Sequence, residues 1–213
     1  MLVGERMTHP VIPVHPETSV PEALTLMRRE KIRRLPVVDH GRLVGIVTDR
    51  DLLHASASSA TTLSVWELNY LLSKLTVAKV MCADVLTVAE NTPIEEAARI
   101  MADNKIGGLP VMRGDHIVGM ITETNLFRVL LEMTGAREKG VRATVLVPDR
   151  AGQLAQLTHA VAELGGNIIA LSTFAGEDPS NSLVMCKIAG IEPELLRERL
   201  APIVERVVDI RES

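Results

Sequence analysis

The stretch LPVVDHGRLVGIVTDRDL, from Leu35 to Leu52, returns downstream as LPVMRGDHIVGMITETNL, from Leu109 to Leu126. The offset is 74 residues, and it holds without a gap back to Met7 and Met81. A match in register over about 45 positions indicates two copies of one supersecondary unit. Most matched positions are apolar or turn residues, so the repeat first of all preserves a core.

Each copy closes with a polar pair. The segments GIVTDRD and GMITETN place Thr48 three residues before Asp51, and Thr122 three residues before Asn125. The apolar run before each threonine predicts a buried strand, and the segment after it predicts a helix. Such a junction leaves free backbone N–H groups and a positive dipole end, where phosphate binds. The same spacing is also that of a capping box, which needs no ligand.

Three features favour a ligand site over a cap alone. A glycine, Gly45 or Gly119, stands three residues before each threonine, where it lets a ligand approach the backbone. The pattern occurs twice in register. Each copy also carries a Leu-Pro-Val strand entry upstream, with Pro36 in the first copy and Pro110 in the second.

The segments KIRRLPVVDHGRLVGIVTDRD and KIGGLPVMRGDHIVGMITETN resemble the two halves of a CBS-domain pair, the adenosine-nucleotide-sensing module. In that family the threonine contacts phosphate, the acid holds the ribose hydroxyls, and the base lies between the first strand and the Leu-Pro-Val strand. The resemblance covers roughly residues 1–133 and implies two pseudo-symmetric clefts for AMP, ADP or ATP. Carried over to this chain, the nucleotide-binding residues are Arg34, Pro36, Gly45, Thr48, Arg50, Asp51, Pro110, Gly119, Thr122, Thr124 and Asn125.

The two clefts are chemically unequal. The basic residues Arg33 and Arg34 precede the first Leu-Pro-Val strand, whereas Gly107 and Gly108 precede the second. These arginines either complement the end of the preceding helix or bind phosphate, for which a guanidinium is well suited. The second copy also has Asn125 in place of an acid. The inequality favours a single bound nucleotide, but the sequence leaves open which cleft Arg34 faces and whether one cleft or both bind.

Composition restricts the class of protein. Of 213 residues, 46% are hydrophobic and only 2% aromatic, so the core is aliphatic and base stacking on aromatic platforms is excluded. The net charge of −4 gives no general attraction to nucleic acid or to anionic membranes. Cys82 and Cys186 form no CxxC motif, which indicates reduced thiols. No apolar run is long enough to span a bilayer and the N-terminus lacks a signal segment, so we expect a cytoplasmic protein.

Changes of pattern along the chain give the predicted domains. The first CBS motif covers 1–60, a linker helix 61–76, the second CBS motif 77–133, a linker 134–140, and a C-terminal domain 141–213. Each CBS copy is predicted to be an α/β unit of order β-α-β-β-α. In the C-terminal domain we expect an α+β fold of ferredoxin-like order βαββαβ. Its predicted strands cover 141–147, 167–175, 182–188 and 203–210, and its predicted helices cover 153–164 and 192–200.

The C-terminal domain also carries a recognisable turn. The segment VPDRAGQLAQLTHAVAELGGNI resembles the ACT domain, a small-ligand module that commonly binds amino acids. This resemblance implies an amino-acid site at Asp149, Gly152, Leu154 and Asn167. Turn chemistry alone also explains the glycine, which opens a helix. A CBS pair followed by an ACT domain resembles the AcuB-type acetoin-utilisation accessory proteins, which implies a regulatory role in acetoin utilisation.

No catalytic motif accompanies these modules: HExxH, GxxxxGK[ST] and GxSxG are all missing, and no histidine spacing suits a metal. We therefore predict a non-catalytic regulatory protein with no metal and no required cofactor. An adenine nucleotide is its regulatory ligand, and the ACT domain serves as a second small-ligand or dimerisation module. The expected partners are an amino acid at that domain, a second copy in a homodimer, and a separate target protein. The alternative is a dimeric interaction scaffold with unoccupied CBS clefts.

Overall fold

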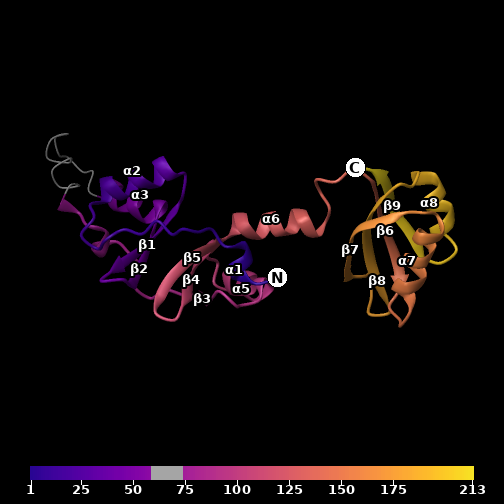
Figure 1. The fold of residues 1–213 in the computed structure, drawn as a ribbon, viewed down its shortest axis with the longest axis horizontal. Coiled ribbons are helices and arrows are strands. Elements are labelled where there is room, and N and C mark those ends of the chain that lie inside the picture. Colours follow the sequence, from indigo (N-terminus) through magenta and orange to yellow (C-terminus); the bar gives the residue numbers. More distant parts are fainter. Residues whose placement is uncertain (59–73) are drawn as a thin grey trace. The chain divides into compact units, whose positions relative to one another are not determined.

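The computed structural model describes residues 1–58 and 74–213, and it divides into two compact units, Met1–Leu126 and Phe127–Ser213. Figure 1 shows the elements of each unit. Most of the predicted linker helix, from 61 to 73, lies outside the described residues. The division falls inside helix α6 (Glu123–Met133), whereas the sequence places a boundary after that helix. Among the described residues, no helix is long and apolar enough to cross a membrane.

The first unit contains the repeat. Its elements are α1 (Val3–Arg6), α2 (Val20–Glu30), β1 (Arg34–Asp39), β2 (Arg42–Thr48), α3 (Asp49–Ser58), η1 (Val77–Lys79), β3 (Val88–Ala89), α5 (Ile94–Asp103), β4 (Gly108–Arg113) and β5 (His116–Thr122). The hairpins β1–β2 and β4–β5 have the same register, with Leu35 opposite Val47 and Leu109 opposite Ile121. Both hairpins shift register at equivalent positions, so the sequence repeat is also a structural repeat.

Each copy buries the same set of side chains. In the first copy the core contains Leu35, Val37 and Val47, and the residues 74 positions later in the second copy are buried as well. Helix α2 begins at the capping box of Ser19 and Glu22, with a proline in its first turn. A local capping signal therefore accounts for the start of α2, and apolar spacing accounts for both cores.

The segments that lead into the two copies are exchanged between them. The N–H of Val3, in the lead-in to the first copy, donates to the Thr92 carbonyl of the second copy at 2.9 Å. The N–H of Val77, in the lead-in to the second copy, donates to the Thr18 carbonyl of the first copy at 2.8 Å. Because of this exchange, Cys82 pairs with Ile46 and lies beside the end of β2.

The second unit has the predicted ferredoxin-like order. Its elements are β6 (Val141–Pro148), α7 (Gln153–Glu163), β7 (Asn167–Ala175), β8 (Asn181–Ala189), α8 (Pro193–Leu200) and β9 (Arg206–Glu212). The strands form an antiparallel sheet in the order β7-β8-β6-β9, and Figure 1 shows α7 and α8 on one of its faces. The predicted start of the last strand at 203 is wrong, because Ile203 and Val204 pack against the core from the turn after α8.

Candidate functional site

The first strand-to-helix junction forms a complete capping box. Oδ2 of Asp51 accepts hydrogen bonds from the Thr48 N–H at 2.9 Å and from the Thr48 hydroxyl at 2.6 Å, and the Asp51 N–H donates back to Oγ1 at 3.3 Å. The N–H of Asp49 donates to the Arg33 carbonyl at 3.1 Å, and that of Arg50 to the Asp49 side chain at 3.0 Å. The prediction of free N–H groups is therefore wrong here, because neighbouring oxygens already accept them.

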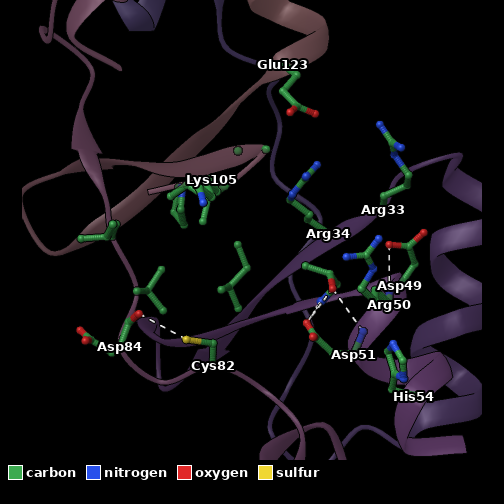
Figure 2. Close-up of a pocket in the computed structure, with 18 of the residues that line it drawn as sticks. Arg33, Arg34, Asp49, Arg50, Asp51, His54, Cys82, Asp84, Lys105 and Glu123 are labelled. Carbon is green, nitrogen blue, oxygen red and sulfur yellow. Dashed lines mark hydrogen bonds between the residues drawn. The ribbon is translucent and has the colours of Figure 1, made fainter. Parts of the chain in front are cut away.

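A cavity of about 840 Å³ lies beside this junction and is lined by both copies (Figure 2). One wall comes from β2 and α3, and the other comes from residues between 82 and 86 and between 105 and 110. This volume falls within the range of small-molecule sites. Of the predicted nucleotide-binding residues, the cavity gathers Arg34, Thr48, Arg50, Asp51 and Pro110.

Charged side chains of both signs line this cavity. The cationic ones are Arg33, Arg34, Arg50 and Lys105, and the anionic ones are Asp49, Asp51, Asp84 and Glu123. Within the described residues, Oδ1 of Asp51 accepts no hydrogen bond, so this carboxylate keeps one oxygen for a ligand. Sequence reasoning missed Asp49, Asp84, Lys105 and Glu123. The repeat does signal one pair, since Asp49 and Glu123 are equivalent first residues of α3 and α6.

The side chain of Arg34 crosses from the first copy to the second. A Cβ atom added at Gly107 would collide with the Arg34 guanidinium and would lie 2.8 Å from Oε2 of Glu123. Burial lowers the pKa of Arg34 from its usual value, and the carboxylate of Glu123 opposes this shift. The open question is thereby answered: Arg34 lines the first cleft, and glycine at 107 makes room for it.

The two glycines that precede the threonines have a different role from the predicted one. A Cβ atom at Gly45 would overlap the Sδ atom of Met81, and one at Gly119 would overlap that of Met7. Both methionines belong to the exchanged lead-in segments. The predicted approach of a ligand to these glycines is therefore wrong, because a methionine side chain already occupies the space above each of them.

The second junction is closed by its amide. Oδ1 of Asn125 accepts from the Thr122 N–H at 3.0 Å and from the Thr122 hydroxyl at 2.6 Å. Its Nδ2 donates to the Arg6 carbonyl at 2.9 Å and to Oγ1 of Thr8 at 3.2 Å. The Asn125 side chain is buried, with 4% of the residue exposed, so both ends of the amide are committed to the protein.

Two further predicted residues, Pro36 and Thr124, do not line the cavity at the first junction. Pro36 is buried in β1 opposite Ile46, and it does not line the cavity beside Thr48. Thr124 is exposed in the first turn of α6, at the position equivalent to Arg50. Within the described part of the chain, a cavity thus lies beside the first junction, and the side-chain amide of the second junction is fully hydrogen-bonded.

The predicted amino-acid site of the C-terminal domain does not converge within one chain. Gly152, with φ +86°, is the N-cap of α7, and Asp149 and Leu154 lie near the same end of that helix. Asn167 begins β7, beyond the opposite end of α7. An eleven-residue helix is about 16 Å long, so Asn167 is separated from the other three residues.

Comparison with known proteins agrees with this architecture. Residues 3–58 and 77–132 both match the CBS domain, and together they make up more than half of the chain. The chain belongs to the CBS-domain family. Residues 139–211 match the TTHA0829-like ACT domain, so this CBS-domain protein carries an ACT domain after its CBS pair.

Solved CBS structures align with 62–65% of the chain. The acetoin utilization protein AcuB from Vibrio cholerae is 32% identical, with a TM-score of 0.55 over 65% of this chain and 96% of its own. CBSX2 in complex with AMP is 35% identical, with a TM-score of 0.52 over 62% and 97%. The CBS pair of MJ0100, in complex with 5'-methylthioadenosine and S-adenosyl-L-methionine, is 29% identical, with a TM-score of 0.54 over 65% and 98%.

Curated relatives differ in how much of their length is matched. A CBS domain-containing protein of Dictyostelium discoideum is 32% identical over 135 residues, which is 62% of this chain and 93% of the relative. An inosine-5'-monophosphate dehydrogenase of Thermoplasma acidophilum is 38% identical over 117 residues, which is 54% of this chain but only 21% of that enzyme. The match to the enzyme is therefore confined to about a fifth of its length.

Proposed function

We propose that this protein is a non-catalytic regulator that binds one adenine nucleotide in the cavity beside Thr48 and Asp51. The observation that carries the proposal is the Asp51 carboxylate, which keeps one oxygen free at the edge of a cavity lined by three arginines. The complexes of CBSX2 with AMP and of MJ0100 with two adenosine compounds support an adenosine ligand.

Each part of the nucleotide has a suitable partner in this cavity. The free Asp51 oxygen accepts hydrogen bonds from ribose hydroxyls, and these are strong because the acceptor is ionised. Arg34 and Arg50 supply guanidinium groups for phosphate. Apolar side chains that include Ile46, Val85 and Ile106 provide a wall for the base. These roles assign phosphate recognition to side chains, since the backbone N–H groups at the start of α3 have other partners.

One nucleotide per chain is expected. Asn125 is buried and fully hydrogen-bonded, so a second ligand would first have to break its bonds to Arg6 and Thr8. Replacing these bonds by bonds to a ligand gives little net gain in free energy. At the first cleft no such bonds have to be broken. We therefore assign single occupancy, and isothermal titration calorimetry with AMP measures it directly as the molar ratio.

The output of binding is regulatory in this proposal. A ligand held by both copies shifts their arrangement by its differential affinity, typically about 1–3 kcal/mol. The ACT domain supplies a second ligand site or a dimer contact, and the likeness to AcuB supports a role in acetoin utilisation, which we place in the cytoplasm. Calorimetry with AMP, ADP, ATP and S-adenosylmethionine tests the core claim, because an absence of heat with all four would refute adenosine sensing.

A second candidate function is a dimeric scaffold with empty clefts. The observation that favours it is the apolar surface of α6, where Phe127 is 64% exposed and Leu130 is 53% exposed. Exposed apolar patches commonly mark protein contacts. Sedimentation analysis with and without AMP separates the two functions: a scaffold is dimeric and indifferent to the nucleotide, whereas a sensor binds it.

A further inference from the structure

The charges around the open cleft balance to zero. Its lining contains the four cationic side chains Arg33, Arg34, Arg50 and Lys105 and the four acidic side chains Asp49, Asp51, Asp84 and Glu123. A phosphomonoester carries about two negative charges at neutral pH, and each further phosphate adds about one. The cleft therefore has no surplus of positive charge with which to neutralise a long polyphosphate.

One of these acids, Glu123, lies on the far side of Arg34 from the junction. Arg34 is the β1 partner of Thr48, which places it next to the junction where Asp51 lies. The far end of Arg34 and the carboxylate of Glu123 both converge on Gly107. Figure 2 shows Arg34 between Asp51 and Glu123 in the cavity. A phosphate chain that runs from a ribose at Asp51 along Arg34 thus advances toward Glu123.

Glu123 already interacts with the same guanidinium. Its charge stabilises the cationic form of Arg34, which burial would otherwise weaken. A terminal phosphate that reaches the end of Arg34 therefore competes with this carboxylate and is also repelled by it. The first phosphate, which lies nearer the ribose, experiences less of this repulsion because Coulomb energy falls with distance.

On this geometry, and resting on the proposed adenine-nucleotide site, we propose that Glu123 is a specificity-determining residue that limits the ligand to few phosphates. The cleft then accepts AMP and uncharged adenosine compounds and discriminates against ATP. Glu123 acts by repulsion, so its removal widens the range of ligands rather than weakening the site. The specificity then arises because ATP is repelled, not because AMP makes better contacts.

The test compares AMP, ADP and ATP by isothermal titration calorimetry on the full chain, at constant ionic strength and without divalent cations. We expect the wild-type protein to bind AMP more tightly than ATP. In Glu123→Gln, which keeps the size of the side chain but removes its charge, we expect the ratio of AMP to ATP affinity to fall about fivefold. Glu123→Asp keeps the charge, and its ratio should stay close to that of the wild-type protein.

The matched control is Glu95→Gln. Glu95 is an exposed carboxylate in the first turn of α5, and it does not line the cleft. An equal change of the ratio in this control would overturn the proposal, because net charge would then be the cause. An unchanged ratio in Glu123→Gln, or a wild-type protein that prefers ATP, would overturn it while leaving adenosine sensing intact. A lack of binding by all three nucleotides to every variant would overturn both proposals together.

Discussion

The two strand-to-helix junctions of the repeat share one hydrogen-bonding pattern at the threonine. They differ in how the polar side chain three residues later uses its second atom. In each, a threonine N–H and hydroxyl donate to a side-chain oxygen three residues later, at 2.9 and 2.6 Å to Asp51 and at 3.0 and 2.6 Å to Asn125. The difference lies in the other terminal atom of each side chain, which is Oδ1 in Asp51 and Nδ2 in Asn125. The Asn125 amide donates to Arg6 and Thr8, whereas the Asp51 carboxylate has no proton to donate.

A single atom therefore distinguishes the two junctions. The nitrogen of the amide ties the N-terminal segment of the chain to the second copy and is buried there. The corresponding oxygen of the carboxylate cannot bond a carbonyl and remains at the edge of the cavity. The acid leaves one oxygen beside the cavity, whereas the amide commits both of its polar atoms to the protein.

The largest effect is expected from Asp51→Ala. Loss of the charged acceptor for the ribose should weaken AMP binding by about 2–3 kcal/mol, or roughly 30- to 150-fold. Loss of the capping box should also lower the free energy of unfolding by about 1 kcal/mol. Calorimetry and urea unfolding measure the two effects separately. Asp51→Asn keeps a cap acceptor, so we expect weaker binding with little loss of stability; binding that follows stability across both variants would leave Asp51 with a capping role only.

The converse substitution, Asn125→Asp, probes the closed junction. It removes the donor to Arg6 and Thr8 and buries a charge, which should lower the free energy of unfolding by about 2 kcal/mol. AMP binding at the first cleft should be nearly unchanged. Urea unfolding with Asp51→Asn as the reciprocal control, for which we expect a loss below about 1 kcal/mol, checks the asymmetry. Equal losses in both variants would contradict it.

A smaller effect is expected where the copies meet at Gly107. In Gly107→Ala the added methyl group should displace the Arg34 guanidinium and lower AMP affinity by about 1 kcal/mol, or roughly fivefold. Adenosine has no phosphate and serves as the internal control, because its affinity should not change. Similar losses for AMP and adenosine, measured in the same titrations, would mean that Arg34 does not contact phosphate.

The smallest effect concerns the thiol at the first cleft. Cys82 is exposed and lines the cavity, at the position that Thr8 occupies in the closed junction. Saturating AMP should slow its alkylation at pH 8 by about threefold, since a ligand restricts access. Cys186 is the internal control, because burial raises its pKa to about 11 and keeps it protonated and unreactive. Unchanged alkylation of Cys82 would remove it from the ligand's surroundings.

Local patterns in the sequence predicted most of the fold. The predicted strand 167–175 coincides with β7 (Asn167–Ala175), and the predicted helix 153–164 matches α7 (Gln153–Glu163) to within one residue, because the glycine that opens this helix is a local turn signal. These signals act over a few residues, so they survive any tertiary arrangement. The predicted start of the last strand is too early because Ile203 and Val204 are apolar residues that pack against the core from a turn, not from a strand.

The candidate site was predicted only in part. Thr48, Asp51 and Arg34 were found from the repeat and the resemblance, but the roles given to Gly45 and Gly119 were wrong. Those glycines accommodate methionines from the exchanged lead-in segments, a contact between residues 36 positions apart at Gly45 and 112 apart at Gly119. No local pattern reports such a contact. Glu123 was missed for the same reason, because only folding brings it to Arg34.

The sequence by itself determined the duplicated unit, its aliphatic cores, the three-residue spacing of the polar pair at each junction, and the order of the C-terminal domain. All of these depend on spacing and on interactions between near neighbours. The tertiary structure alone decided which lead-in segment covers which copy, which polar side chain at a junction keeps an atom without a partner, and which acids and bases share the cavity. These outcomes depend on which donors and acceptors, far apart in the sequence, come within hydrogen-bonding distance in the folded chain. The sequence does not state those distances.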